Sequence, residues 1–161
     1  MWHYIINNNM RITELFDTTV DYEWSTNSSG GPRGTTMMQD KPMSVDFYPN
    51  NPEFGMWAVE FDIEGETKKT GAGNELKVFA AFMQALDHVL KANHPECMWW
   101  TASVSEPTRV SMYQKLVNRA GRRNPEYTDV SMNDAAWPPA LKNLIASDRK
   151  NKYSILMRNP T

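Results

Sequence analysis

The sequence has almost no cysteine and no long apolar runs, and both features limit the classes of protein to which it can belong. Cys97 is the only cysteine among the 161 residues, so no disulfide can form within the chain, as is usual in a reducing compartment. No segment approaches the roughly 20 consecutive apolar residues of a membrane-spanning helix. Residues 1–9 form a short extension without the basic start and apolar core of a signal peptide. We therefore expect an unexported, cytoplasmic protein without membrane association.

A surplus of positive charge is also missing. The formal net charge is -2 and the sequence pI is near 5.9, which argues against a general nucleic-acid binder. The charge is spread unevenly, because residues 1–66 hold eleven acidic and three basic side chains, whereas residues 67–161 hold eight acidic and fourteen basic ones. An anionic ligand would therefore be accommodated better by the second part of the chain.

Clusters of metal ligands are missing as well. His3, His88 and His94 share no spacing typical of a metal site, so we expect no metal. Cys97 opens an apolar strand pattern with no histidine near it in sequence, which favours a small buried hydrophobe over a nucleophile. His88 follows Asp87 in a helical pattern and is expected to face solvent.

The first part of the chain has the alternation of half-buried strands. Apolar and polar residues alternate in Val20–Trp24, Met43–Tyr48 and Trp57–Ile63. The stretch between the first two is rich in Ser, Asn, Gly, Pro and Thr, and it predicts a mobile surface loop at Thr26–Thr36. Because Asn50–Pro52 predicts a turn, these segments together indicate an antiparallel meander.

The pattern changes to helical spacing after Gly73. Apolar residues recur every three or four positions from Leu76 to Leu90, which predicts an amphipathic helix. The run Cys97–Ser103 is apolar on both faces and predicts a central strand. A second helix opens with Ser105 as a cap and runs until Gly121 stops it. A short helix near Ala140–Ala146 and a final strand at Tyr153–Arg158 follow. The adjacent Trp99 and Trp100 would suit either the core or an exposed contact surface.

A glycine-containing stretch separates the last meander strand from the first helix. It consists of Lys68, Lys69, Thr70, Gly71, Ala72, Gly73 and Asn74. Two glycines let the backbone approach a ligand, and the free N–H groups and positive dipole end of a helix start suit a pyrophosphate. A tight turn with a glycine helix start explains the same residues without any ligand.

In its order of strand, glycine loop, helix, strand and helix, the chain resembles the GNAT superfamily of acyl-CoA N-acyltransferases over residues 57–157. The family's cofactor loop reads Arg or Gln, two residues, Gly, one residue, then Gly or Ala; here Lys68, Gly71 and Gly73 take those places. Lysine keeps the positive charge of arginine but lacks the planar guanidinium group, which can donate two parallel hydrogen bonds to a phosphate. The resemblance implies a mixed, mainly antiparallel α/β sheet with helices on both faces, one domain over residues 1–161, and acetyl-CoA bound by Lys68–Asn74.

The resemblance also implies an acid. The helix that contains Tyr113 is similar to the family's stretch of a small residue, Leu, Tyr, Glu, Lys and Leu, in which the tyrosine protonates the departing thiolate of coenzyme A. After the tyrosine, family members usually close the helix with a Gly-Phe pair, whereas this chain continues to the basic residues Arg119, Arg122 and Arg123. A core aromatic on an amphipathic stripe explains Tyr113 equally well.

A base has to take a proton from the acceptor amine, and the family often uses a carboxylate on the strand before the glycine loop. Glu60, Asp62 and Glu64 alternate there, and one of them could serve. The same alternation is expected of any solvent-facing strand surface.

In Met10–Phe16 and in the helix opening Ser105–Arg109, the chain is similar to a set of bacteriophage-encoded GNAT-like proteins. Two functions follow from the resemblance. One is an N-acetyltransferase that moves an acetyl group from acetyl-CoA to the amine of a small molecule or a protein. The other is a catalytically inactive phage protein, a virion component or a binder of host factors, that keeps the fold for protein contacts.

Overall fold

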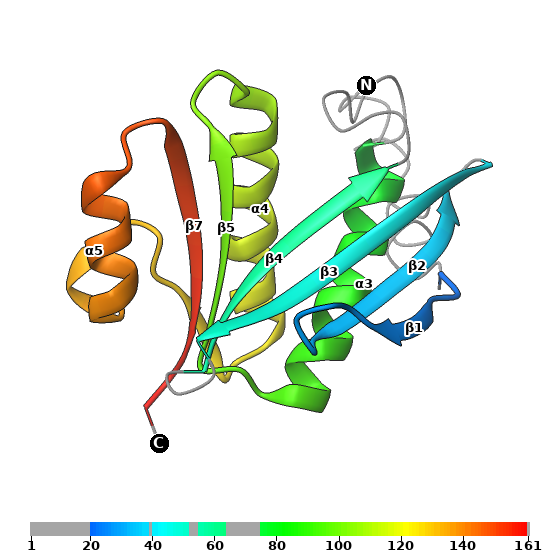
Figure 1. Cartoon of the computed structure of the whole chain (residues 1–161), viewed down its shortest axis with the longest axis horizontal. Coiled ribbons are helices and arrows are strands. Elements are labelled where there is room, and N and C mark those ends of the chain that lie inside the picture. The colour runs from blue at the N-terminus through cyan, green and yellow to red at the C-terminus, as the bar shows by residue number, and fades with distance from the viewer. Residues whose placement is uncertain (1–19, 39, 52–54, 64–74, 161) are drawn as a thin grey trace.

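Figure 1 shows the computed structural model, which describes residues 20–38, 40–51, 55–63 and 75–160. The predicted extension at residues 1–9 lies outside these ranges. The elements in chain order are β1 Glu23–Thr26, β2 Pro32–Met38, β3 Lys41–Asn51, β4 Met56–Ile63, α3 Glu75–Asn93, β5 Cys97–Ser103, α4 Pro107–Arg123, β6 Tyr127–Asp129, the 3-10 helix η2 Asp134–Ala136, α5 Pro139–Ser147 and β7 Asn151–Arg158. Within the described ranges the strands form one sheet, in the order β1-β2-β3-β4-β5-β7-β6.

The first four strands form an antiparallel meander, which confirms the antiparallel arrangement that the alternation predicted. The alternation indicated only three of these strands, and the first lies at Glu23–Thr26 instead of Val20–Trp24. The loop predicted at Thr26–Thr36 is wrong in its second half, because Pro32–Met38 is strand β2. Threonine is a good strand former on a half-exposed face, and this property outweighs the low apolar content of the segment. The turn is confined to residues 27–31, where the side-chain oxygen of Asn27 accepts hydrogen bonds from the N–H groups of Ser29 and Gly31 at 3.1 and 3.0 Å. The mobility of this turn stays a prediction.

Helices cover both faces of the sheet, as the resemblance implied. Helices α3 and α4 lie side by side on one face (Figure 1) and close the main core against β2 to β7. Helix α5 closes a smaller core on the opposite face, where Leu141 packs near Cys97 and Ile155. Within the described ranges the fold is therefore a mixed α/β sheet, antiparallel except for the pair β4 and β5.

Both predicted ends of the second helix are wrong. Its first residue is Pro107 and its N-cap is Glu106, because the Ser105 hydroxyl is hydrogen-bonded to that of Ser103 at 2.7 Å. Gly121 lies inside α4 rather than after it. A Cβ atom at Gly121 would come within 3.3 Å of the backbone nitrogen of Asp129, so this glycine allows close packing of α4 against β6 instead of stopping the helix.

The central strand β5 was predicted with its observed bounds, and its side chains alternate between the two cores. Trp100 is fully buried in the main core, so it is not part of an exposed contact surface. Trp99 points to the other face and is half-buried. Cys97 is fully buried, which confirms the predicted small hydrophobe.

We use the name open face for the part of the sheet opposite α3 and α4 that carries the side chains of Ser44, Tyr48, Glu60 and Asp62. These residues alternate with the core residues Val45, Phe47, Val59 and Phe61 along β3 and β4, so they point the other way. Glu60 and Asp62 are exposed there. Helix α5 packs on this side of the sheet, against β5 and β7 (Figure 1), and Ala136 of the short η2 packs against the same core.

Candidate active site

The sheet opens between β4 and β5, its only parallel pair in the described part of the chain. The two strands pair over three positions, which are Met56 with Cys97, Trp57 with Met98 and Ala58 with Trp99. Beyond Trp99, β5 continues in register with β7, and beyond Ala58, β4 continues in register with β3. The strands therefore diverge toward their carboxyl ends, as Figure 1 shows. Such an opening offers strand backbone groups to a bound molecule.

The opening faces the starts of both long helices. Figure 1 shows α3 and α4 beginning at the same end of the sheet as the carboxyl ends of β4 and β5. Helix starts carry free N–H groups and the positive end of the helix dipole, so this end of the molecule suits an anion. The predicted cofactor residues Lys68–Asn74 and the base candidate Glu64 lie outside the described residues.

Tyr113 projects from α4 toward the opening on the helix side of the sheet. Its side chain is buried, and its ring meets the ring of Phe61 on β4 edge to face, with centroids 5.6 Å apart. The Arg109 guanidinium lies one turn earlier on α4 and 5.7 Å from the Phe61 ring centroid. Burial raises the pKa of Tyr113 to about 12, with a lowering contribution from Arg109 and raising ones from Glu60 and Glu106. The phenol is therefore protonated at neutral pH.

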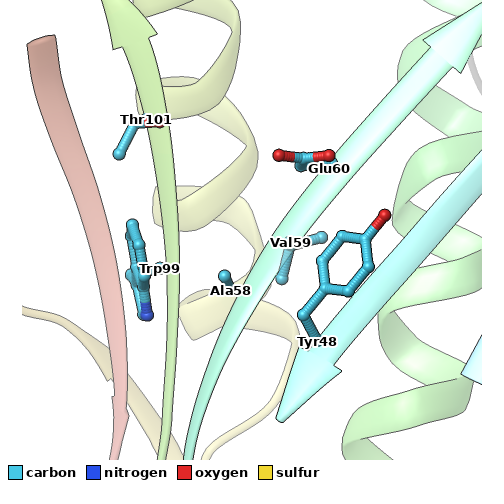
Figure 2. Close-up of a pocket in the computed structure, with 6 residues that line it drawn as sticks. All are labelled: Tyr48, Ala58, Val59, Glu60, Trp99 and Thr101. Atoms are coloured by element: carbon cyan, nitrogen blue, oxygen red, sulfur yellow. The ribbon is translucent and has the colours of Figure 1, made fainter. Parts of the chain in front are cut away.

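A cavity of about 300 Å³ lies at the opening on the other side of β4. Its lining residues are Tyr48, Ala58, Val59, Glu60, Trp99 and Thr101, shown in Figure 2. The base candidate Glu60 is thus part of the cavity wall. Asp62 lies two residues further along the same face of β4 and is not among the lining residues. Of the two described candidates, the structure brings only Glu60 to the cavity.

Tyr113 and Glu60 lie on opposite faces of the sheet, near the point where β4 and β5 separate. Phe61 faces α4 and Tyr113, whereas its neighbour Glu60 faces the cavity, because successive strand residues point to opposite faces. The negative charge of Glu60 adds to the raised pKa of Tyr113, after burial as the main cause. A carboxylate and a protonated phenol therefore flank one gap from opposite sides, an arrangement that could accept a proton at one end and donate a hydrogen bond at the other.

Of the six lining residues, the sequence indicated only Glu60 as a site residue, and three of the missed ones, Tyr48, Trp99 and Thr101, come from other strands. The alternation placed Tyr48 on the polar side of its strand and Trp99 on one side of β5, but nothing local indicated that β4 and β5 are neighbours. Only that pairing, with Ala58 opposite Trp99, brings the three residues to the same cavity.

The described residues hold no group of three or more His, Cys, Asp or Glu side chains arranged to bind a metal ion. None of the described helices is both long and apolar enough to cross a membrane. His88 is exposed, as expected, although its ring also stacks on Trp24 with centroids 4.4 Å apart.

No protein-family model matches the sequence, and no curated protein matches it either. Among solved structures, the chain is similar to a chimera of the spermidine N-acetyltransferase SpeG from Vibrio cholerae and hSSAT, with 10% identity, a TM-score of 0.49, and coverage of 94% of this chain and 90% of that one. It is also similar to the N-acetyltransferase PseH of Campylobacter jejuni in complex with acetyl coenzyme A, with 8% identity, a TM-score of 0.47, and coverage of 99% and 83%. A third similar structure is RimL, a ribosomal L7/L12 alpha-N-protein acetyltransferase, with 11% identity, a TM-score of 0.42, and coverage of 99% and 83%. These likenesses are remote.

Proposed function

We propose that this protein is an N-acyltransferase that moves an acetyl group from acetyl-CoA to an amine. The observation that carries the proposal is the opening between β4 and β5, with Tyr113 on the helix side and Glu60 in the cavity on the other side. The opening fits an extended thioester chain, because it combines diverging strand edges with two helix starts at its wide end. Lys68–Asn74 are proposed to hold the pyrophosphate.

The chain's own residues have two tasks in this reaction. Acetyl-CoA, when bound, supplies the acyl group, and coenzyme A leaves as a thiol. Glu60 accepts the proton that the amine nitrogen loses as its bond to the acyl carbon forms, directly or through a water molecule. Tyr113 donates a hydrogen bond to the sulfur as the carbon–sulfur bond breaks.

The raised pKa of Tyr113 limits how far its proton moves. A thiol titrates near about 8.5, so complete transfer from a phenol with a pKa of about 12 would be uphill by about 5 kcal/mol. We infer that Tyr113 stabilises the developing thiolate chiefly through its hydrogen bond, and that the sulfur takes its final proton from solvent.

The first test is a calorimetric titration with acetyl-CoA, in which saturable binding is expected. Gly71→Trp and Gly73→Trp should abolish it, because a bulky side chain would occupy the space of the pyrophosphate. A wild-type protein that binds no acetyl-CoA at millimolar concentration would contradict the proposal and favour the inactive phage protein. The phage origin and a virion role stay predictions.

The second test separates the catalytic groups. Glu60→Gln should lower kcat by about a hundredfold or more with acetyl-CoA binding unchanged. Tyr113→Phe should lower kcat by about tenfold, the loss of one hydrogen bond to a developing charge. Asp62→Asn tests the other base candidate and should have a much smaller effect than Glu60→Gln. Glu23→Gln is the matched control, because it removes a carboxylate from strand β1, away from the opening. If Asp62→Asn has the larger effect, the base is Asp62.

A further inference from the structure

We propose that the cavity selects the acceptor, and that the acceptor is a primary amine on an uncharged apolar stem, with its cationic head at Glu60. This inference rests on the proposed acyl transfer. The cavity of about 300 Å³ has room for a stem of about ten water-sized groups, at about 30 Å³ for each.

The cavity has an apolar end and a polar end. Ala58 and Trp99 are the last paired residues of β4 and β5, so they lie at the closed end of the opening. Figure 2 shows the indole nitrogen of Trp99 at the end of the ring away from Glu60, and the Tyr48 hydroxyl pointing away from Trp99. The indole nitrogen lies at this closed end, but it is buried and has no hydrogen-bond partner among the described residues, so ring carbons and a methyl group form the cavity surface here. Glu60 and Thr101 form the other end, further along the diverging strands.

The charges around the cavity favour a cation and disfavour a carboxylate. Of the described residues, Glu60 is the only charged one in the lining. Its neighbour in register on β3 is Asp46, whose carboxylate is paired with Arg33 at 2.7 Å. The pKa of Tyr48 is raised by burial first, then by the charges of Asp46 and Glu60, and Arg33 only partly offsets them. An amine head is attracted to this negative field, whereas an amino acid would bring its own carboxylate into it.

Tyr153 holds the Trp99 ring, which lines the cavity, in a fixed position. The ring of Tyr153 on β7 stacks on Trp99, with centroids 5.8 Å apart and an interplanar angle of 27°. The Tyr153 hydroxyl donates a 2.7 Å hydrogen bond to Asp148, which also accepts hydrogen bonds from Asn151 and from the backbone N–H of Lys150. Tyr153 is therefore a positioning residue, and Trp99 presents a fixed surface that can discriminate between stems.

The test uses a pair of ligands with the same stem. Phenethylamine has about nine non-hydrogen atoms, a size for which the cavity has room, and phenylalanine adds a carboxylate next to the amine. Binding of each to the full chain is measured by ligand-observed NMR and calorimetry without acetyl-CoA. Phenethylamine should bind, and phenylalanine should bind at least about tenfold more weakly because one unfavourable charge contact of about 1.4 kcal/mol gives that factor. Equal binding of the two would overturn the proposal.

Variants of the lining residues test whether phenethylamine binds in the cavity. Ala58→Leu fills the closed end and should weaken phenethylamine binding at least about tenfold, the cost of a lost apolar subsite. Trp99→Leu should also weaken it, and Tyr153→Phe should do so by a smaller factor, because it keeps the stack and loses only the hydrogen bond. Glu23→Gln is the control and should change nothing. Circular dichroism verifies that each variant is folded. If Ala58→Leu and Trp99→Leu both leave binding intact, the cavity is not the site.

The outcomes for the cavity and for the reaction are separate. If the protein binds acetyl-CoA but not phenethylamine, the acyl transfer stands and the acceptor proposal is overturned. If phenethylamine binds in the cavity and is acetylated while phenylalanine is not, both are supported. If it binds there but acetyl-CoA does not bind, the amine site stands and the acyl transfer fails.

Discussion

Burial sets the chemistry of single side chains in this protein more than neighbouring charges do. For both Cys97 and Tyr113, the main cause of the raised pKa is loss of water around the group. The consequences differ with position. Cys97 is sealed in the smaller core, whereas Tyr113 packs against Phe61 at the opening between β4 and β5. The same physical effect therefore makes one group inert and keeps the other protonated for a proposed role.

Cys97 should be unreactive in the native protein. Burial raises the pKa of its thiol to about 12 and leaves no exposed surface, and the thiolate is the form that reacts. In a disulfide-exchange assay at about pH 8 the native protein should release no chromophore, and in guanidinium chloride it should react with one equivalent. Fast reaction of the native thiol would show that β5 opens or that this core is loosely packed.

At the scale of elements, turns fix how strands and helices are placed relative to one another. The turn at residues 27–31 is held against β3, because the Asn27 amide donates a 3.0 Å hydrogen bond to the Phe47 carbonyl. The turn before β7 is held by Asp148 at the end of α5. Each turn has a residue whose replacement gives a specific expectation.

Gly31→Ala should destabilise the β1–β2 hairpin strongly. A Cβ atom there would lie 1.8 Å from the Phe47 carbonyl oxygen, so the turn would have to move off β3. We expect a loss of about 2 to 3 kcal/mol in the free energy of unfolding. Gly30→Ala is the matched control: its φ of 81° is unfavourable for alanine, but nothing lies within 4 Å of the added atom, so the loss should be about 1 kcal/mol. Urea titrations measure both. A larger loss for Gly30→Ala would contradict the steric argument.

Asp148 should make stability depend on pH in the acid range. Hydrogen bonds from Asn151 and Tyr153 lower the pKa of its carboxyl from 3.8 to about 2. Because the folded pKa is the lower one, the stabilisation is fully present above about pH 4 and is lost as the pH falls toward about 2. Asp148→Asn should therefore be less stable than the wild type at neutral pH, with the difference shrinking between about pH 4 and 2. Thermal unfolding of both proteins at a series of pH values measures this difference in stability. A constant difference would indicate a role other than ionisation.

At the scale of the whole molecule, β5 and β7 belong to both cores, since their side chains point alternately to each. Neither core can open without disturbing a shared strand. The negative open face and the helix starts also lie on opposite sides of the same opening. Packing and the proposed chemistry therefore depend on one sheet.

The described part of the chain should unfold in one transition. Leu86 is fully buried in the main core and Leu141 in the smaller one, and replacing either by alanine should cost about 2 to 5 kcal/mol. Both variants should shift a single curve that fluorescence and far-ultraviolet circular dichroism trace together. Leu144→Ala, in α5 but 44% exposed, should change stability by less than about 0.5 kcal/mol. If Leu141→Ala splits the transition, α5 folds as a separate unit.

The sequence alone determined the positions and types of the main elements, because hydrophobic periodicity is a local property. The strand at Cys97–Ser103, the helix that contains Leu86 and the buried state of Cys97 could all be predicted in this way. The ends of α4 could not be predicted in this way. Gly121 allows close packing against β6 and does not end the helix, and this contact is not visible in the local pattern. Only the tertiary structure decided that β4 and β5 pair for three positions and then separate, and that Tyr48, Glu60 and Trp99 share a cavity. Those features depend on contacts between residues far apart in the chain, which no local pattern encodes.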